Sequence, residues 1–376
     1  MKQISVGIIP APELPEAIAN KLALKLETAF SMQIDNNISW NVEVVLDQLT
    51  GASGRSDEII KRALALKAEH NWEYAICLTD MPIFSDKTVV LAEGDDGKGV
   101  AQISIPAFGA FPLKTRVKKA IIQMVGELYF RINGHGTYVN SDIVERNNKQ
   151  LMKSERKFSP VKKVLPDNED ADLRFIVRPR IHGLFRLIAG MTYANRPWRI
   201  IPAFKRVVAV AFATGAYGLV FTTLWNISAA YGGLQFTLLT LIAIAGMVIW
   251  IIFAHNLWEK HNAKTSRKLT MLYNMVTVVT LTSSVIVYYA VLYILFLFAV
   301  VFFVPPDLFV HTVGIKDNNI HEHFIQLAWL VTSVAVIAGA MGSGLENDKT
   351  VRKIMYGHRQ WQRYKEMEHN DDFLKE

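Results

Sequence analysis

The hydrophobic and polar positions of this chain follow two different patterns, and the change falls near residue 206. Up to about residue 172, charged residues are spread throughout, and apolar positions alternate or recur every three to four residues. Beyond residue 206, long apolar runs dominate as far as residue 341. Alternation predicts strands, the three-to-four spacing predicts amphipathic helices, and runs of about 20 apolar residues predict membrane spans. We therefore expect an α/β soluble domain, a mixed sheet with helices, followed by an all-α transmembrane four-helix bundle.

The first 136 residues predict strands and helices in the order βαβα, followed by further strands and a last helix. The first helix places Leu14, Ile18, Leu22 and Leu26 on one face, a spacing typical of packing against a sheet. We interpret residues 1–136 as an α/β domain large enough to bury its own core. The predicted strands are 3–9, 40–46, 74–79, 87–92 and 100–105, and the predicted helices are 12–30, 57–68 and 114–132.

The membrane half, residues 207–345, contains four apolar stretches. The third, counted from Leu269 to Val304, has a length of roughly 54 Å as a helix, which is long for one crossing. The loop of residues 255–268 and the tail of residues 346–376 are rich in Lys and Arg, whereas the other loops carry a single cation. The positive-inside rule then favours one crossing by the third stretch. We predict a multi-pass protein of the cell membrane with both termini in the cytoplasm. The predicted spans are 207–229, 234–254, 270–304 and 326–343.

Polar residues within the predicted spans are few and uncharged. The absence of Asp, Glu, Lys and Arg there argues against a proton-coupled transporter, while a passive pore stays an alternative. Asn226 and the Thr and Ser residues of 277–284 are explained more readily by hydrogen bonds between helices than by a substrate path. In the fourth span, Ala335 and Gly339 have the small-xxx-small spacing of close helix packing. We expect this packing within the chain, with a homo-oligomer as the alternative.

Residues 174–206 join the two halves and carry eight cations, no acid, and interleaved aromatic residues. Clustered cations beside a span favour an anionic leaflet, and aromatic side chains settle at headgroup level. We predict that this segment lies on the membrane surface and docks the soluble domain there, although the cations could equally serve topology alone. We interpret the charged stretch of residues 137–173 before it as a linker. The predicted headgroup-binding residues are Arg174, Arg178, Arg180, Arg186, Arg196, Arg199 and Trp198.

Two glycine-rich segments of the N-terminal half raise the question of nucleotide binding. The segment 94–99 lies between two strands and carries two carboxylates that would repel phosphate, so we reject it as a nucleotide-binding site. The segment 51–55 follows a strand and precedes a helix, where backbone amides can hold an anion, but a tight turn explains its glycines equally well. Asp80 follows a strand, at the position where open α/β sheets place ligands. Nucleic acid is not an expected partner, because the adjoining span already explains the basic segment.

The order of elements over residues 1–136, with Leu78-Thr79-Asp80 after the third strand, resembles the archaemetzincin-type zinc proteases. The zinc-binding helix of metzincins carries His-Glu-x-x-His-x-x-Gly-x-x-His. In the matching segment Glu127 falls at the position of the general base, Gly126 and Phe130 stand where two zinc ligands belong, and His135 lies one residue before the third. The resemblance therefore implies a scaffold that has lost its metal. We predict no metal, no other cofactor and no catalytic residue.

Two remaining features add little to this interpretation. Cys77 is the single cysteine, which excludes an intrachain disulfide, and the chain start does not resemble a secretory signal, so the N-terminal domain is expected in the cytoplasm. Three histidines and one glutamate fall in the predicted external loop, which we interpret as a plain polar loop: His311, His321, Glu322 and His323.

The sequence thus favours a non-catalytic membrane protein whose cytoplasmic α/β domain binds a protein partner or a small ligand, with a role in sensing, scaffolding or regulation. One alternative is a membrane-associated enzyme that acts through the α/β domain. A second alternative is a passive channel or transporter.

Overall fold

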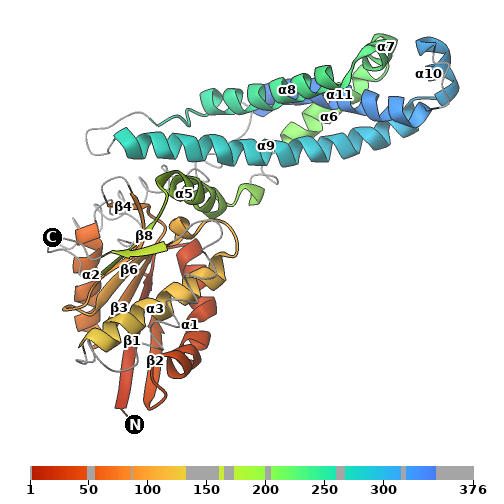
Figure 1. Cartoon of the computed structure of the whole chain (residues 1–376). Helices are drawn as coiled ribbons and strands as arrows, with labels where there is room; N and C mark the ends of the chain where they lie inside the picture. Colours follow the sequence, from red (N-terminus) through yellow and green to blue (C-terminus); the bar gives the residue numbers. More distant parts are fainter. Residues whose placement is uncertain are drawn as a thin grey trace, which may run out of the picture. The chain divides into compact units, whose positions relative to one another are not determined.

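The structure is a computed structural model of the whole chain (Figure 1). It describes residues 2–48, 56–85, 88–132, 161–164, 173–199, 205–259, 267–314 and 319–343. The chain divides into two compact units, which we call the α/β unit, whose described residues end at Ala194, and the helical unit, Asn195–His358.

The α/β unit contains a mixed sheet with helices on both faces. Its strands are β1 (Lys2–Pro10), β2 (Ile38–Val44), β3 (Tyr74–Thr79), β4 (Ile83–Ser85), β5 (Thr88–Asp95), β6 (Val100–Ser104), β7 (Val161–Val164) and β8 (Leu173–Val177). Its helices are α1 (Leu14–Gln33), α2 (Ser56–Glu69), the short 3-10 helix η2 (Ile105–Phe108), α3 (Leu113–Ile132) and α5 (Arg180–Ala194).

The sheet is parallel on one side and antiparallel on the other. The strand order is β2-β1-β3-β6-β5-β8-β7, with β4 paired to β5. The first four strands of that order run parallel, and β5, β8 and β7 each run antiparallel to the strand before them. Helices α1 and α3 lie together on one face, and α2 covers the other, where Ile9 and Cys77 pack against it (Figure 1). Apolar side chains thus fill both layers between sheet and helices.

The strands and helices predicted before residue 133 are confirmed within a few residues at each end. The prediction that the domain ends at residue 136 is wrong, because β7 and β8 belong to the same sheet. Both strands fall in segments that we interpreted as linker and membrane-surface chain. Strand β8 lies between β5 and β7, and Leu173, Phe175 and Val177 are buried. Residues 173–177 are therefore an inner strand of the sheet.

A glycine, Gly190, allows helix α5 to pack closely against the 3-10 helix η2. A Cβ atom on Gly190 would meet the carbonyl group of Pro106 in η2, so a larger residue has no room at this contact. Gly183 of the same helix faces Val177 and Val89. The first part of the predicted membrane-surface segment is consequently a packed element of the α/β unit.

The helical unit is built from long apolar helices and three short ones. They are the 3-10 helix η3 (Pro197–Arg199), α6 (Lys205–Gly218), α7 (Thr222–Ala230), α8 (Gly233–Ala254), α9 (Arg267–Phe303), α10 (Pro306–Val313) and α11 (Ile320–Ser343). Three of these, α8, α9 and α11, are long and apolar enough to cross a membrane, and α6 with α7 would make a fourth span if the bent pair counts as one.

The third apolar stretch forms one continuous helix of 37 residues, α9. At 1.5 Å per residue its length is roughly 55 Å, which a bilayer of about 40–45 Å with its headgroup regions accommodates when the helix tilts. A chain reversal inside this stretch is thereby excluded.

The first predicted span, 207–229, is not one straight helix. Helices α6 and α7 meet at 92° across a break at residues 219–221. The indole of Trp225 donates a hydrogen bond to the carbonyl oxygen of Leu219 at 2.9 Å, so the side chain satisfies a backbone group that the break releases. The ring of Trp225 also packs on Phe309 of α10, with 5.5 Å between centroids. The predicted external loop around α10 is accordingly helical in large part.

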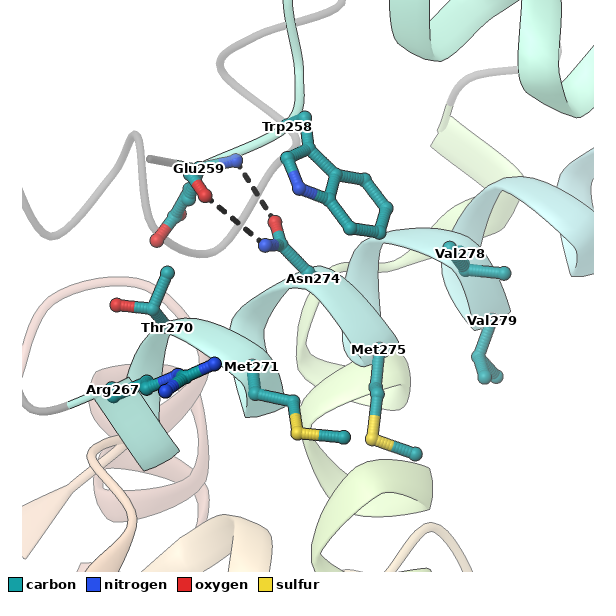
Figure 2. Close-up of a pocket in the computed structure, with 9 residues that line it drawn as sticks. All are labelled: Trp258, Glu259, Arg267, Thr270, Met271, Asn274, Met275, Val278 and Val279. Atoms are coloured by element: carbon teal, nitrogen blue, oxygen red, sulfur yellow. Dashed lines mark hydrogen bonds between the residues drawn. The ribbon is translucent and has the colours of Figure 1, made fainter. Parts of the chain in front are cut away.

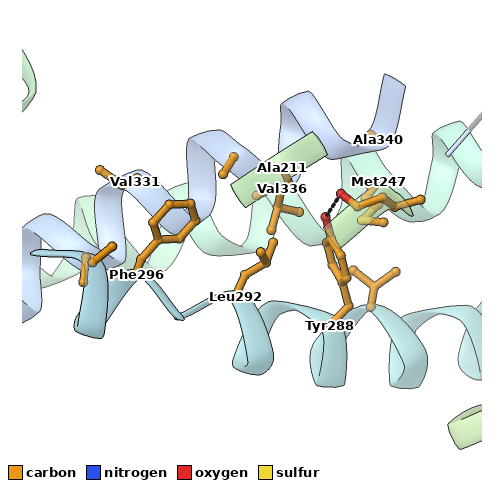
Figure 3. Packing of buried hydrophobic residues seen from close by; sticks show 14 of the residues in the cluster. Ala211, Met247, Tyr288, Leu292, Phe296, Val331, Val336 and Ala340 are labelled. Carbon is orange, nitrogen blue, oxygen red and sulfur yellow. Dashed lines mark hydrogen bonds between the residues drawn. The ribbon is translucent and has the colours of Figure 1, made fainter. Parts of the chain in front are cut away.

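The core of the helical unit joins α6, α8, α9 and α11 through interlocking side chains (Figure 3). Small residues of α11 let the helices approach closely. A Cβ atom on Gly339 would lie 2.5 Å from the hydroxyl of Tyr288 and 3.0 Å from the Cβ of Ala211. Ala335 packs close to Gly215 in the same way. The expectation that this small-residue spacing serves packing within the chain is confirmed for Ala335 and Gly339.

The helical unit is apolar on its outside and carries polar groups within. Large apolar side chains such as Leu234, Phe253 and Phe302 are exposed on the long helices. Inside, the Thr240 hydroxyl accepts a hydrogen bond from the Trp329 indole at 2.7 Å and lies 3.2 Å from the Tyr289 hydroxyl. This arrangement suits a hydrocarbon surrounding, since a polar group facing lipid would have no partner.

We expect Gly339→Ala to destabilise the helical unit, because the added methyl group has no space beside Tyr288. Overpacking of this kind costs about 1–3 kcal/mol, more than the helix propensity that alanine gains. Gly246→Ala is the matched control, since nothing lies within 4 Å of a Cβ atom there. Thermal unfolding of the detergent-solubilised protein measures both. Equal midpoints for the two variants would contradict this packing.

Candidate functional site

The α/β unit presents apolar side chains to its surroundings on helix α5. Ile181 and Phe185 are 69% and 70% exposed, and Leu184 is also exposed. These residues occupy positions i, i+3 and i+4, so they share one face of the helix. Arg178 and Arg180 are exposed at the start of the same helix. An apolar helix face flanked by cations is typical of a segment that lies on an anionic membrane surface.

Two of the predicted headgroup-binding arginines serve the interior instead. The Arg174 guanidinium donates hydrogen bonds to the buried Glu93 carboxylate at 3.0 Å and to the Ser85 hydroxyl at 2.8 Å. Gln102 donates to the other oxygen of the same carboxylate. Arg186 lies over the ring of Phe108, with 5.8 Å from its Cζ atom to the centroid. Arg174 compensates a buried charge, which takes it out of the predicted lipid-binding set.

The remaining predicted headgroup residues lie in the helical unit. Trp198 of η3 is 49% exposed, as a headgroup-level aromatic side chain would be. Arg196 is half-buried, with a backbone φ of 51°, in the left-handed region. Arg199 ends η3. Contact of these residues with lipid stays a prediction.

The carboxyl edge of the parallel strands, where open α/β sheets place ligands and where Asp80 lies, contains local hydrogen bonds among its described residues. The Ser104 hydroxyl donates to the Met81 carbonyl at 2.7 Å, and the Met81 amide donates to the Thr79 hydroxyl at 3.0 Å. Asp80 is buried there. Asp47 at the same edge pairs with Arg62 at 2.9 Å. The segment 51–55 lies outside the described residues.

The metzincin-like helix position holds an ion pair. Both Glu127 carboxylate oxygens accept hydrogen bonds from Lys163 Nζ at 2.8 Å, which ties α3 to β7. Within the described ranges, no group of three or more His, Cys, Asp or Glu side chains is arranged to hold a metal ion. His135 lies outside those ranges. Glu127 therefore has a structural partner where the resemblance would place a general base.

The other polar segments singled out in the sequence also have structural roles. The turn after β5 is a hairpin connection in which Asp95 accepts hydrogen bonds from the backbone and side chain of Lys98. His311 lies in α10, while His321, Glu322 and His323 lie in the first turn of α11. These histidines are thus helical residues and do not form an extended loop.

The Thr and Ser cluster at 277–284 contributes to the packing of the helical unit. The Thr280 hydroxyl accepts a hydrogen bond from the Asn195 amide at 2.9 Å, and the Ser284 hydroxyl donates to the Thr280 carbonyl. Asn226 donates to the Thr222 carbonyl within its own helix. We expected hydrogen bonds between helices; Thr280 and Ser284, which also donates to the Pro197 carbonyl at 3.3 Å, do bond to another segment, whereas Asn226 bonds only within its own helix. These contacts weaken the main support for a passive pore.

The helical unit contains a groove at the amino-terminal end of α9, with a volume of about 610 Å³, which we call the α9 groove. Figure 2 shows its polar residues near the start of the helix and its apolar residues along the following turns. Sequence reasoning missed it, because its residues come from two segments that appear unremarkable separately. The groove is lined by Trp258, Glu259, Arg267, Thr270, Met271, Asn274, Met275, Val278 and Val279.

Glu259 is fixed in the α9 groove through its backbone. The Asn274 side chain accepts a hydrogen bond from the Glu259 amide at 2.9 Å and donates one to the Glu259 carbonyl at 3.1 Å (Figure 2). Burial raises the pKa of the Glu259 carboxyl to about 7, because desolvation disfavours its charged form. Asn274 is itself buried.

Comparisons with protein-family models, with curated proteins and with solved structures gave no match to this chain. The resemblance to metzincins consequently stays a prediction, and the function has to be argued from the residues themselves.

Arg174→Gln should destabilise the α/β unit, whereas Arg180→Gln should leave its stability unchanged. The first change leaves the Glu93 carboxylate buried without its cation, at a cost of roughly 2–4 kcal/mol. The second removes an exposed charge, which costs less than about 0.5 kcal/mol. Amide hydrogen exchange of β5 and β8 in the full-length protein reports the difference. Unchanged exchange in Arg174→Gln would show that the ion pair is dispensable.

Proposed function

We propose that this chain is a multi-pass membrane protein whose N-terminal α/β domain stays in the cytoplasm, docks on the inner leaflet through α5, and binds a protein partner or small ligand without catalysis. The observation that carries the proposal is the exposed apolar face of α5 beside Arg178 and Arg180. The chain continues from this helix into the apolar helices after only a short connection.

Docking through α5 has a physical basis in both of its surface features. Burying the side chains of Ile181 and Phe185 in the headgroup boundary removes apolar area from water, and each cation near an anionic leaflet adds about 1 kcal/mol. In water this exposed face would have no compensating contact. A membrane surface supplies the apolar and the anionic part together.

Support for a non-catalytic role comes from four of the buried acids in the described part of the α/β domain, which also contains the buried Asp80. Glu93, Glu127, Asp47 and Asp95 each face a cation within 3.0 Å. Carboxylates paired in this way hold neighbouring elements together, and an acid or base for catalysis would instead need access to a reacting group. Such pairing suits a domain that binds a protein partner or a small ligand without catalysis.

Docking of α5 on the membrane can be measured by the quenching of a fluorophore attached to α5 in the full-length protein. Phe185→Cys, labelled with an environment-sensitive dye in nanodiscs, should show quenching by doxyl-labelled lipid that strengthens with the fraction of phosphatidylglycerol. Met32→Cys on α1, a position that is 79% exposed, is the control and should stay unquenched. The buried Cys77 gives little labelling of its own. If both sites respond alike, or neither responds to anionic lipid, α5 does not dock.

The proposed topology places Asn319 outside and Met32 inside the cell. In intact cells, Asn319→Cys should react with a membrane-impermeant maleimide, whereas Met32→Cys should react with it only after the cells are lysed. Reaction of Asn319→Cys restricted to lysed cells would refute the proposed orientation.

A further inference from the structure

The α9 groove lies where a membrane would have its headgroups, if the helical unit spans a bilayer as proposed. It opens between the end of α8 and the start of α9, and both helices are long enough to cross. Trp258 is exposed beside it, as an aromatic residue at the interface would be. From Arg267 to Val279 the helix rises by roughly 18 Å, which reaches from the headgroups into the hydrocarbon region.

The polar end of the α9 groove carries one acid and one base. Glu259 and Arg267 both line it, and no ion pair joins their side chains in the part of the chain that the structure describes. Thr270 also lines this end, and Figure 2 shows its side chain between those of Glu259 and Arg267. A carboxylate and a guanidinium that face one cavity are complementary to a ligand with a cation and an anion a few bonds apart.

The other end of the α9 groove is apolar and open. Met271 is 65% exposed, and Met275 and Val279 are exposed one and two turns further along the same face. Methionine side chains adapt to irregular apolar partners such as acyl chains. A ligand that fits both ends is therefore an amphiphile whose charged head leads into a hydrocarbon tail.

We propose that the α9 groove binds the headgroup of a bilayer phosphatidylethanolamine, with its ammonium group on Glu259, its phosphate on Arg267 and an acyl chain along Met271 and Met275. The primary ammonium donates hydrogen bonds to a carboxylate, whereas the trimethylated ammonium of phosphatidylcholine has no N–H to donate. Phosphatidylglycerol lacks a cation altogether. The site should therefore select ethanolamine over both.

Trp258 supplies the readout of binding. The full-length protein is placed in bilayers of brominated phosphatidylcholine, and its Trp258 fluorescence is taken as the difference from the Trp258→Phe variant. Unbrominated phosphatidylethanolamine should relieve the quenching at a concentration roughly three- to tenfold lower than unbrominated phosphatidylcholine or phosphatidylglycerol does. Equal relief by the three lipids overturns the proposal and makes the groove a place for unselected bilayer lipid.

Two substitutions with matched controls assign the headgroup contacts. Glu259→Gln should abolish the preference for ethanolamine over choline, and Arg267→Gln should weaken relief by all three lipids, since each carries the same phosphodiester. Glu322→Gln and Lys268→Gln change the same charges outside the groove and should have no effect. A preference that survives Glu259→Gln refutes the assignment of the ammonium site.

The preference should also depend on pH. Glu259 binds an ammonium group when it is ionised, and among the described residues Arg267 is the other charged side chain that lines the groove. Since burial raises the pKa of Glu259 to about 7, selectivity should grow as the pH rises from 5.5 to 8, and Glu259→Gln should show no such change. These measurements report lipid binding by the helical unit, and the quenching experiment on α5 reports docking of the α/β unit. Either result can therefore be negative while the other is positive.

Discussion

If the helical unit spans a bilayer, as we propose, its structure depends on one constraint, which is that a polar group there must find its partner within the protein. Thr240, Tyr289 and Trp329 meet this need by bonding to one another across α8, α9 and α11. The break between α6 and α7 meets it through the indole of Trp225. The outer faces of the long helices are apolar for the same reason. Polar contacts and close packing at small residues therefore act together where these helices meet.

The sequence predicted the regular parts of both units because their signals are local. Alternation and helical spacing located β1, β2, β3, β5, β6 and the helices α1, α2 and α3, but not the short elements β4 and η2, and apolar length located α8, α9 and α11. Strands β7 and β8 were missed, since each is short and gains its stability from pairing with residues far away in the chain. The bend after Gly218 was missed as well, because a side chain stabilises it and no proline marks it. Local patterns carry no information on such distant partners.

The candidate sites also differ in whether the local sequence could reveal them. The exposed cations Arg178 and Arg180 and the aromatic Trp198 could be singled out from composition, because surface charge next to a span is visible in the sequence. Arg174 has the same appearance there, yet Glu93 lies 81 residues earlier and becomes its partner only in the folded sheet. The α9 groove was invisible for the related reason that Asn274 holds Glu259 in place across a loop. Composition identifies a charge, and the fold decides whether it faces its surroundings.

The position of β8 in the sheet has a consequence for the biosynthesis of the chain. Strand β5 keeps an unpaired edge until residues 173–177 arrive, so the α/β domain cannot complete its fold from the preceding residues alone. Residue 177 precedes the start of α6 by about thirty residues. The last inner strand and the first apolar helix therefore leave the ribosome in close succession. If α6 and the helices after it enter a membrane, as we propose, completion of the domain and delivery of the nascent chain to that membrane fall close together in time.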